Sequence, residues 1–205
     1  MKKKRFRSAL CAAALILGLS APALAYSDVA EGRWYSANIQ KVTAMGLMTG
    51  VSADRFAPAA TVTRGTAITV LWRLEGSPAP KTAASFPDLS EGNWAYAAAA
   101  WAKEMGIASG YSGGNFGSGD SVTREQLATF LYRYALYKKS EIARGVTDLY
   151  QDAPFISRWA LTGMQHALGS GLMTGTSAST LSPLGLATRA ELASILVRLT
   201  TPVEG

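Results

Sequence analysis

Three arginines, each directly after a threonine at the predicted start of a helix, are the residues of this chain best suited to binding chemistry. The phrases that contain them are Val62-Thr63-Arg64, Val122-Thr123-Arg124 and Ala187-Thr188-Arg189. Threonine is a preferred N-cap residue, because its hydroxyl accepts a hydrogen bond from a free backbone N–H group at the helix start. The arginine then occupies the first helical position, beside unpaired N–H donors and the positive end of the helix dipole. This combination suits a carboxylate or a phosphate, and it predicts three anion-binding places or one built from parts of three.

The same arginines have a structural alternative, in which each pairs with a neighbouring carboxylate and only stabilises packing. A second arginine follows nine residues later in every copy, at Arg73, Arg133 and Arg198. Nine residues turn a helix by about half a circle, so the two arginines of one helix cannot share a ligand. We expect the second set to cover a neighbouring repeat or to pair with an acidic group.

The three helix starts differ at the third helical position, which decides how well the helix is capped. Glu191 completes a capping box with Thr188, and Gln126 can do the same with Thr123. Thr66 is a poorer match, so the first of these helix starts is predicted to be the least rigid.

The arginine phrases belong to a sequence repeat, in which an aspartate, a tryptophan and a glycine-bounded turn recur in the same order. These landmarks are Asp28, Asp88 and Asp148, then Trp34, Trp94 and Trp159, then the turns 46–50, 106–110 and 171–175. The three aspartates are evenly spaced, whereas for the tryptophans, turns and arginines the second interval is longer than the first by five positions. This difference predicts a five-residue insertion in the third copy, within residues 150–158.

Each repeat predicts two helices joined by a loop. The first helix starts near the tryptophan and ends at a glycine suited to a left-handed C-terminal cap, which is Gly46, Gly106 or Gly171. An irregular loop follows, and the Thr-Arg phrase starts the second helix. Two helices and a loop of this size cannot bury a core alone. We therefore expect an all-α domain whose repeats, residues 26–78, 84–138 and 145–201, pack on one another.

Two of the repeated landmarks admit a structural role beside a functional one. The aspartates share one local context, which favours ordering a loop or joining repeats over a catalytic pair, since such a pair needs two unlike environments. The tryptophans could stack on a sugar ring, but a tryptophan that opens an amphipathic helix is more often part of the core. We favour the core for Trp34 and Trp159 and keep Trp94 as a candidate ligand contact.

The second glycine of each turn is a further candidate, at Gly50, Gly110 and Gly175. These turns could line a groove with backbone groups next to Thr49, Ser109 and Thr174. The alternative is that the glycines only cap helices.

Residues 1–25 have the pattern of a secretory signal peptide, with a basic start, an apolar stretch at 9–19 and the small-residue site Ala23-Leu24-Ala25. The apolar stretch is shorter than the roughly 20 residues that span a bilayer. Cleavage after Ala25 would leave 15 Lys and Arg against 14 Asp and Glu, a formal net charge of +1 in place of +6. The basic excess belongs to the leader, so composition does not support binding to nucleic acid or to an anionic membrane. We expect an exported protein with no further transmembrane segment.

The sequence offers few parts for catalytic or metal chemistry. Cys11, the single cysteine, lies in the predicted leader, and His166 is the single histidine. A histidine metal cluster or a hydrolase triad needs more of these residues, so we expect His166 to be structural. The pair Gly113-Gly114 has no predicted strand before it and is interpreted as a turn. We expect no enzyme, no metal site and no cofactor.

The repeats resemble the S-layer homology domain, which usually occurs as a triplet. The shared pattern is an aspartate followed by an apolar residue, a tryptophan, a turn between two glycines, a loop phenylalanine and a Thr-Arg-x-Glu-like helix start. It is most complete in the second copy, in Phe86-Pro87-Asp88, Trp94 and Val122-Thr123-Arg124-Glu125-Gln126-Leu127-Ala128. The first copy has Gly65-Thr66 where the family favours Ala-Glu, and the third has Leu181 in place of the loop aromatic.

The resemblance implies an all-helical pseudo-threefold spindle that binds pyruvylated secondary cell-wall polysaccharide and holds surface proteins noncovalently on bacterial cell walls. The residues expected to bind ligand are Arg64, Arg124, Arg189, Thr123, Thr188, Gly50, Gly110, Gly175 and Trp94. Because only the second copy keeps every part, we expect the best-formed site beside Arg124. The alternative is a secreted structural or protein-interaction module of the cell surface, in contact with other surface-layer proteins and with little glycan binding of its own.

Overall fold

The computed structural model describes residues 26–83 and 86–201, and the predicted signal peptide lies outside these residues. The α-helices are α1 (Ser36–Ala44), α2 (Arg64–Leu74), α3 (Tyr96–Glu104), α4 (Arg124–Tyr137), α5 (Leu161–Gly169) and α6 (Arg189–Thr200), with a short 3-10 helix at Ala153–Phe155. The described residues contain no β-strand and only isolated bridges between loops. The predicted all-α class is confirmed, and each repeat contributes two α-helices.

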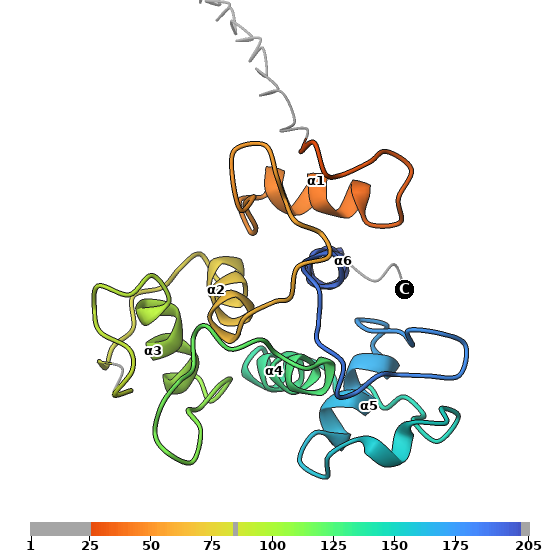
Figure 1. Cartoon of the computed structure of the whole chain (residues 1–205). Coiled ribbons are helices and arrows are strands. Elements are labelled where there is room, and N and C mark those ends of the chain that lie inside the picture. Colours follow the sequence, from red (N-terminus) through yellow and green to blue (C-terminus); the bar gives the residue numbers. More distant parts are fainter. Residues whose placement is uncertain (1–25, 84–85, 202–205) are drawn as a thin grey trace, which may run out of the picture.

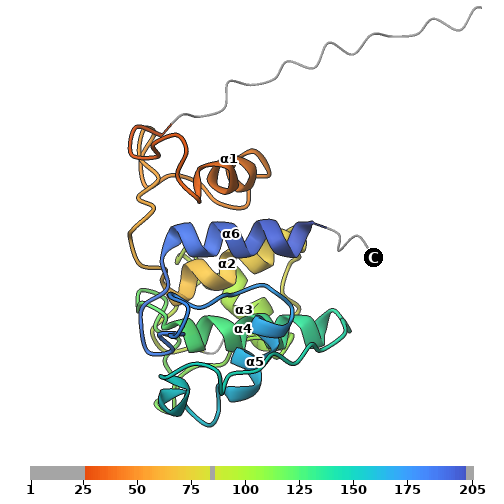
Figure 2. The same cartoon turned by 90° about the vertical axis from the view of Figure 1, so that its right-hand side faces the viewer.

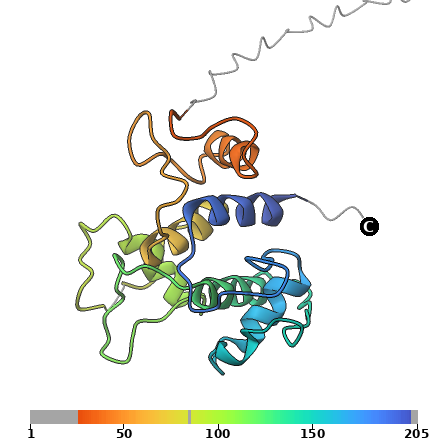
Figure 3. The ribbon, with the colours of Figure 1, turned by 45° about the vertical axis from the view of Figure 1, so that its right-hand side comes forward.

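The second helix of each repeat lies at the centre of the molecule, and the first helix lies outside it. Figure 1 shows α2, α4 and α6 gathered at the centre, with α1, α3 and α5 around them. Each outer helix packs against the inner helix of the preceding repeat, so that α3 contacts α2, α5 contacts α4 and α1 contacts α6. Figures 2 and 3 show α1 beside α6 and α5 beside α4 from two further directions. The third repeat therefore closes back on the first, while the pseudo-threefold symmetry of a spindle stays a prediction.

Apolar residues of the loops and inner helices fill the core between the repeats. Phe56, Phe116 and Leu181, at corresponding loop positions, have no exposed surface. The third copy thus fills the aromatic position with a smaller leucine without exposing it. Burial of a side chain of this size stabilises a fold by about 1.5–3 kcal/mol, so these residues anchor the loops to the core.

The inner helices begin, and the outer helices end, at the predicted residues. The inner helices start at the arginines of the Thr-Arg phrases, and each N-cap threonine accepts a hydrogen bond from the backbone N–H three residues later. The glycines after the outer helices, Gly46, Gly106 and Gly171, have φ angles of 69°, 70° and 68°. This left-handed conformation favours glycine, and it ends each outer helix as predicted.

Three aspartates order the loops, but in the third repeat the aspartate is Asp152. Asp28 accepts 2.8 Å hydrogen bonds from the backbone N–H groups of Phe56 and Ala57. Asp88 accepts the same pair of bonds from Phe116 and Gly117, and Asp152 accepts them from Leu181 and Ser182. Burial acts to raise the pKa of Asp28 and of Asp88, but the backbone hydrogen bonds outweigh it and hold both pKa values below their ordinary range.

The assignment of Asp148 to this role was wrong. The Asp148 carboxylate accepts a 3.3 Å hydrogen bond from the adjacent Thr147 hydroxyl instead. An aromatic residue two positions before the loop-ordering aspartate packs on the second glycine of the turn in each copy, at Tyr26, Phe86 and Tyr150. Tyr150 lies four positions later than the interval from Tyr26 to Phe86 predicts, so most of the insertion precedes Tyr150. A count at constant spacing from one aspartate to the next therefore selects the wrong carboxylate.

Candidate binding pockets between the repeats

The backbone N–H groups at the start of the inner helices are already hydrogen-bonded. In α2, the N–H of Arg64 donates to the Asp120 carbonyl at 2.8 Å, and that of Gly65 donates to the Ser118 carbonyl at 3.0 Å. The third N–H, from Thr66, donates to the N-cap hydroxyl. The same pattern joins α4 to the third repeat and α6 to the first. The expectation that these N–H groups would help to bind an anion is wrong, because a loop of the next repeat supplies the acceptors for the first two and the N-cap threonine supplies the acceptor for the third.

Two nitrogens of each guanidinium join one repeat to the next. Arg64 donates from Nε to the Phe116 carbonyl at 2.8 Å and from Nη2 to the Ser109 carbonyl at 2.9 Å. Arg124 makes the same pair of bonds to Leu181 and Thr174, and Arg189 makes it to Phe56 and Thr49. These arginines therefore join the repeats, chiefly by hydrogen bonds to backbone carbonyls. Arg124 also pairs with the carboxylate of Glu191.

In the Arg64 and Arg189 guanidinium groups, the third nitrogen, Nη1, is available to another hydrogen-bond partner. Within residues 26–83 and 86–201, no hydrogen bond or ion pair of the protein involves either of these nitrogens. Burial lowers the pKa of both side chains, but a guanidinium is so basic that both remain charged. Aromatic rings hold the cations in place, since Arg64 lies 4.5 Å from the centre of the Tyr111 ring and Arg189 lies 4.5 Å from that of Phe56.

Three pockets lie at the joints, and every one is lined by residues from all three repeats. One repeat contributes the arginine that starts its inner helix, the next contributes its glycine turn and inner helix, and the third contributes its tryptophan. We name them the Arg124 pocket (with Trp34), the Arg189 pocket (with Trp94) and the Arg64 pocket (with Trp159). Their volumes are about 340, 190 and 120 Å³, respectively. The molecule thus has three places, each built from parts of three repeats.

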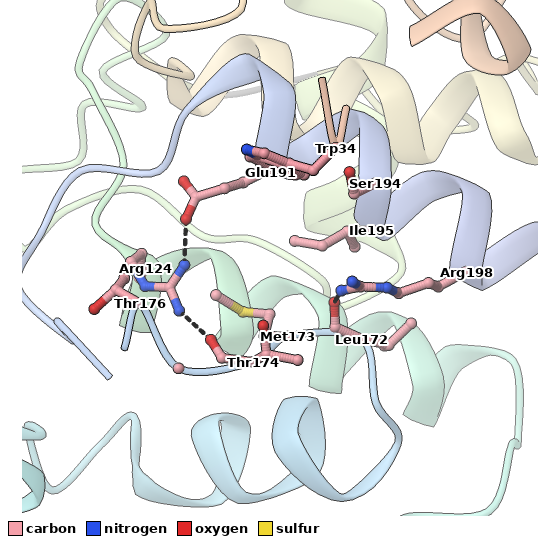
Figure 4. A pocket seen from close by; sticks show the side chains of 11 residues that line it. Trp34, Arg124, Leu172, Met173, Thr174, Thr176, Glu191, Ser194, Ile195 and Arg198 are labelled. Carbon is pink, nitrogen blue, oxygen red and sulfur yellow. Dashed lines mark hydrogen bonds and ion pairs between the residues drawn. The ribbon is translucent and has the colours of Figure 1, made fainter. Parts of the chain in front are cut away.

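The Arg124 pocket contains an internal ion pair. Figure 4 shows the Arg124 guanidinium between the Glu191 carboxylate and the Thr174 carbonyl. Arg198 lies on the other side of the pocket and donates to the Leu172 carbonyl at 2.8 Å. The pocket therefore contains two cations and one carboxylate.

The Arg189 pocket has two cations and no carboxylate among its lining residues. Arg73 joins Arg189 there and donates to the Leu47 carbonyl at 3.1 Å. Two threonines of α2, Thr66 and Thr69, line the same space. Thr69 is 5% exposed, and its hydroxyl has no hydrogen-bond partner among the described residues.

The Arg64 pocket is the smallest and also has no carboxylate in its lining. Arg133 is its second cation, and Gln126 occupies the position that Glu191 has in the Arg124 pocket. The charge of Arg133 contributes to the lowered pKa of Arg64, after burial, because like charges that share a site oppose each other. An anion between the two arginines would relieve that repulsion.

The second arginines were predicted to cover a neighbouring repeat or to pair with an acidic group, and this was wrong for Arg73 and Arg198. Both donate to a carbonyl of their own repeat and line a pocket. The predicted separation of the two arginines in one helix is confirmed, since Arg64 and Arg73 line different pockets.

The tryptophans do not belong to the core. Trp34, Trp94 and Trp159 are 63%, 61% and 58% exposed, so the core prediction for Trp34 and Trp159 was wrong. Each precedes an outer helix that packs on the preceding repeat, and this packing carries its indole to the rim of a pocket. An exposed indole beside cations is suited to stacking on a sugar ring.

In the first two repeats, the residue directly after the arginine that starts the inner helix affects the placement of the tryptophan of the next repeat. A Cβ atom on Gly65 would lie 2.8 Å from the Trp94 ring, so glycine leaves room for that indole. Glu125 takes the corresponding position in the second repeat, is 2% exposed, and accepts hydrogen bonds from the N–H and hydroxyl of Ser157 at 2.9 and 2.8 Å. These contacts fix the chain two residues before Trp159.

The turn glycines Gly50, Gly110 and Gly175 line the pockets and are needed for close packing. A Cβ atom on Gly50 would lie 2.5 Å from the Ser52 carbonyl and 2.5 Å from the Tyr26 ring. The Gly50 N–H also donates to the Tyr26 hydroxyl at 2.9 Å. Helix capping belongs to other glycines, so the capping alternative for this set was wrong.

Sequence reasoning gave several pocket residues no binding role, namely Thr66, Thr69, Arg73, Arg133 and Arg198. The signal for the arginines is that a second arginine follows the first by nine residues in all three repeats. The second arginine then shares a pocket with the first arginine of a different repeat. The signal for Thr69 is that the residue five positions after the first arginine is polar in every repeat, as Thr69, Thr129 or Ser194, and that each lines a pocket.

The described residues contain neither a cluster suited to a metal ion nor a helix suited to a membrane span. No three or more His, Cys, Asp or Glu side chains there are grouped so that they could hold a metal ion. No helix in that part of the chain has the length and apolar character needed to span a membrane. His166 is buried in α5, where its ring lies 5.9 Å from that of Tyr132.

Comparison with known proteins finds one family match in each of the three repeats. The family model described as "S-layer homology domain" matches residues 25–68, 85–128 and 150–193, which together make up more than half of the chain. The third match begins at Tyr150, in agreement with the position of Asp152.

Three curated relatives match most of this chain. The endoglucanase of Bacillus sp. strain KSM-635 is 30% identical over 178 residues, which are 86% of this chain and 19% of that protein. The exoglucanase XynX of Acetivibrio thermocellus is 28% identical over 186 residues, 89% of this chain and 17% of that protein. The cellulosome-anchoring protein of the same species is 27% identical over 153 residues, 73% of this chain and 34% of that protein. The chain thus spans about a third or less of the length of these relatives.

Proposed function

The chain belongs to the S-layer homology domain family, and we propose that it binds noncovalently to the bacterial cell wall by recognising the acidic, pyruvylated groups of a secondary wall polysaccharide. The name of one relative, a cellulosome-anchoring protein, supports a role in anchoring at the cell surface. The chemistry of the pockets supports an acidic carbohydrate as the ligand.

The observation that carries this proposal is the composition of the pockets, each of which combines two guanidinium groups with one exposed indole. A ketal-linked pyruvate presents a carboxylate on a sugar ring. A guanidinium can bind a carboxylate through two parallel hydrogen bonds, and an indole face can cover the apolar side of the sugar. One pocket therefore contacts both parts of a pyruvylated sugar.

Retention on the wall requires several contacts that act together. A solvent-exposed ion pair contributes only about 0–1 kcal/mol, so a single arginine on an open surface would not hold a polymer. The arginines of the pockets are partly buried, which strengthens their interaction with an anion. A polymer that enters more than one pocket also gains from the high effective concentration of the second contact.

A pull-down on purified wall polymer tests this function. Replacement of Arg73, Arg133 and Arg198 by glutamine removes one cation from each pocket, and we expect this triple variant to lose most of its binding. Arg144→Gln is the matched control, because Arg144 is exposed and lines none of the three pockets. Full binding by a correctly folded triple variant would refute the proposed use of the pockets.

A second candidate is a protein-interaction module of the cell surface. The observation in its favour is the exposure of two large apolar side chains in the third repeat, Leu149 at 78% and Phe155 at 67%. Retention of the protein on walls from which the polysaccharide has been extracted, and loss of that retention in a Leu149→Ser/Phe155→Ser variant, would favour it.

A further inference from the structure

The three pockets differ at one corresponding position, the third residue of the inner helix that lines each pocket. This residue is Glu191 in the Arg124 pocket, Gln126 in the Arg64 pocket and Thr66 in the Arg189 pocket. We propose that it decides which pocket accepts an acidic group: the Arg189 pocket is the principal site for the ligand carboxylate, and Glu191 reserves the Arg124 pocket for an uncharged sugar. This inference rests on the proposed function and states which pocket binds which part of the ligand.

Glu191 already occupies the place at Arg124 that a ligand carboxylate would need. Its Oε1 accepts from Arg124 Nη1 at 2.5 Å, and its Oε2 accepts from the backbone N–H and the hydroxyl of Thr188 at 2.7 and 2.9 Å. The Arg124 side chain is only 6% exposed. A second carboxylate would have to displace this held carboxylate or lie beside it, and like charges repel strongly in a partly buried site. The space of about 340 Å³ therefore suits a neutral sugar against Trp34.

The Arg189 pocket has the opposite balance of charge. Arg189 and Arg73 face a lining without any carboxylate, and Nη1 of Arg189 has no hydrogen-bond partner among the described residues. Thr66 is too short to reach across the pocket as Glu191 does, and its hydroxyl lies 3.0 Å from that of the N-cap Thr63. The pocket therefore carries two positive charges and no negative charge in its lining, and the carboxylate of Asp28 acts on Arg189 from outside the lining.

The Thr69 hydroxyl is an independent sign of a polar ligand in this pocket. Its counterparts in the other pockets bond to the helix backbone, Thr129 to the Glu125 carbonyl at 2.8 Å and Ser194 to the Ala190 carbonyl at 3.1 Å. The Thr69 hydroxyl is buried and has no hydrogen-bond partner in residues 26–83 and 86–201. A buried polar group without a hydrogen bond destabilises a fold, and a ligand oxygen in the pocket would satisfy it.

The Arg64 pocket is a secondary acidic site. It also lacks a carboxylate, and Gln126 uses its Oε1 to accept from the Thr123 N–H, so the amide adds no negative charge. Its volume of about 120 Å³ is smaller than the 190 Å³ of the Arg189 pocket. We therefore expect weaker binding of the acidic sugar there.

The tryptophans allow each pocket to be observed separately, because every pocket contains a different indole. The test is an NMR titration of the indole N–H signals with a hexose glycoside that carries a ketal-linked pyruvate, and with the same glycoside without the pyruvate. The variants are Thr66→Glu, which recreates the Glu191 arrangement beside Arg189, and Glu191→Gln, which recreates the arrangement found with Gln126. Thr66→Gln is the matched control, since it adds the same bulk as Thr66→Glu without the charge.

With the acidic sugar, we expect the Trp94 signal of the unmodified protein to respond at the lowest concentration and the Trp34 signal to stay unchanged. Thr66→Glu should weaken the Trp94 response about tenfold or more, as expected for loss of a charge-assisted contact, and should leave Trp159 unchanged. Glu191→Gln should make Trp34 respond to the acidic sugar.

Other results would overturn this assignment. An equal response of Trp34 and Trp94 in the unmodified protein would show that Glu191 does not select, and an equal loss in Thr66→Gln and Thr66→Glu would show that bulk and not charge matters. A response of the indoles to both sugars alike would refute the assignment but leave carbohydrate binding intact. No response of any indole to either sugar would refute the proposed function as well.

Discussion

The Arg189 guanidinium donates a 2.8 Å hydrogen bond from Nε to the backbone carbonyl of Phe56, a residue 133 positions earlier in the chain. The bond connects the third repeat to the first. Together with the corresponding bonds of Arg64 to the second repeat and of Arg124 to the third, it joins the repeats in a closed series. The same guanidinium groups line the pockets, so the residues that close the fold also supply positive charge to the proposed binding sites.

Arg189→Ala should destabilise the protein as well as weaken binding. The substitution removes hydrogen bonds to the carbonyls of Phe56 and Thr49 and the cation over the Phe56 ring. Loss of charge-assisted bonds of this kind costs about 2 kcal/mol in the free energy of unfolding, measured by urea denaturation. Arg144→Ala, at an exposed position, should change it by less than about 0.5 kcal/mol. Equal stability of the two variants would contradict the role of Arg189 as a joint.

Asp152→Asn and Asp148→Asn form a matched pair for the loop of the third repeat. Asp152 accepts from the N–H groups of Leu181 and Ser182 at 2.8 and 2.7 Å, and an amide can accept only one of these bonds. We expect Asp152→Asn to lower the free energy of unfolding by about 2 kcal/mol and Asp148→Asn to lower it by less than about 0.5 kcal/mol. If Asp148→Asn destabilised the protein more than Asp152→Asn in thermal or urea unfolding, Asp148 would be the loop-ordering aspartate after all.

Thr69→Val should separate binding from stability. The Thr69 hydroxyl is buried without a partner, so its replacement by a methyl group should leave the melting temperature unchanged or raise it. Binding of the acidic sugar should fall, because the hydroxyl is then missing from the pocket. In the control Thr129→Val, a hydrogen bond to the Glu125 carbonyl is lost, and stability should fall by about 1 kcal/mol. A drop in melting temperature for Thr69→Val equal to that of Thr129→Val would show that Thr69 is an ordinary structural residue.

The stability of the protein should decrease below neutral pH because of His166. Burial lowers the pKa of this side chain, against the effect of its hydrogen bond to the Ala143 backbone, and its Nδ1 is buried without a partner. The unfolded chain therefore binds the proton more readily than the folded one, so the free energy of unfolding falls as the pH drops below about 6.5. Unfolding measured between pH 7.5 and 5 should show this slope, and His166→Gln should reduce it. An unchanged slope in the variant would assign the effect to other groups.

The local parts of the fold were predictable from the sequence, because a short segment determines them. The threonine caps, the first helical position of Arg64, Arg124 and Arg189 and the positive-φ glycines all depend on a few neighbouring residues. The partners of those arginines were not predictable in this way. A carbonyl such as that of Phe116 becomes an acceptor for Arg64 only when a second repeat packs against the first.

The tryptophans and Asp152 show two further reasons for wrong predictions. The apolar character of Trp159 favours burial, but its exposure is set by the packing of α5 on α4, which no pattern within one repeat encodes. The role of Asp152 could have been recognised from Tyr150, the aromatic residue two positions before it. Tyr26 and Phe86 stand at the same distance before the loop-ordering aspartates of the first and second repeats. The aromatic and aspartate pair aligns the third repeat more reliably than the aspartate alone.

The central proposal is that the protein selects acidic wall polymer, and one comparison of affinity tests it. The dissociation constant of the protein is measured for native wall polysaccharide and for the same polysaccharide after removal of its pyruvyl groups, at one salt concentration. Because the pockets hold their positive charge in partly buried sites, we expect at least about tenfold weaker binding to the stripped polymer, and a smaller difference at high salt. Equal dissociation constants for the two polymers would contradict recognition of the acidic groups.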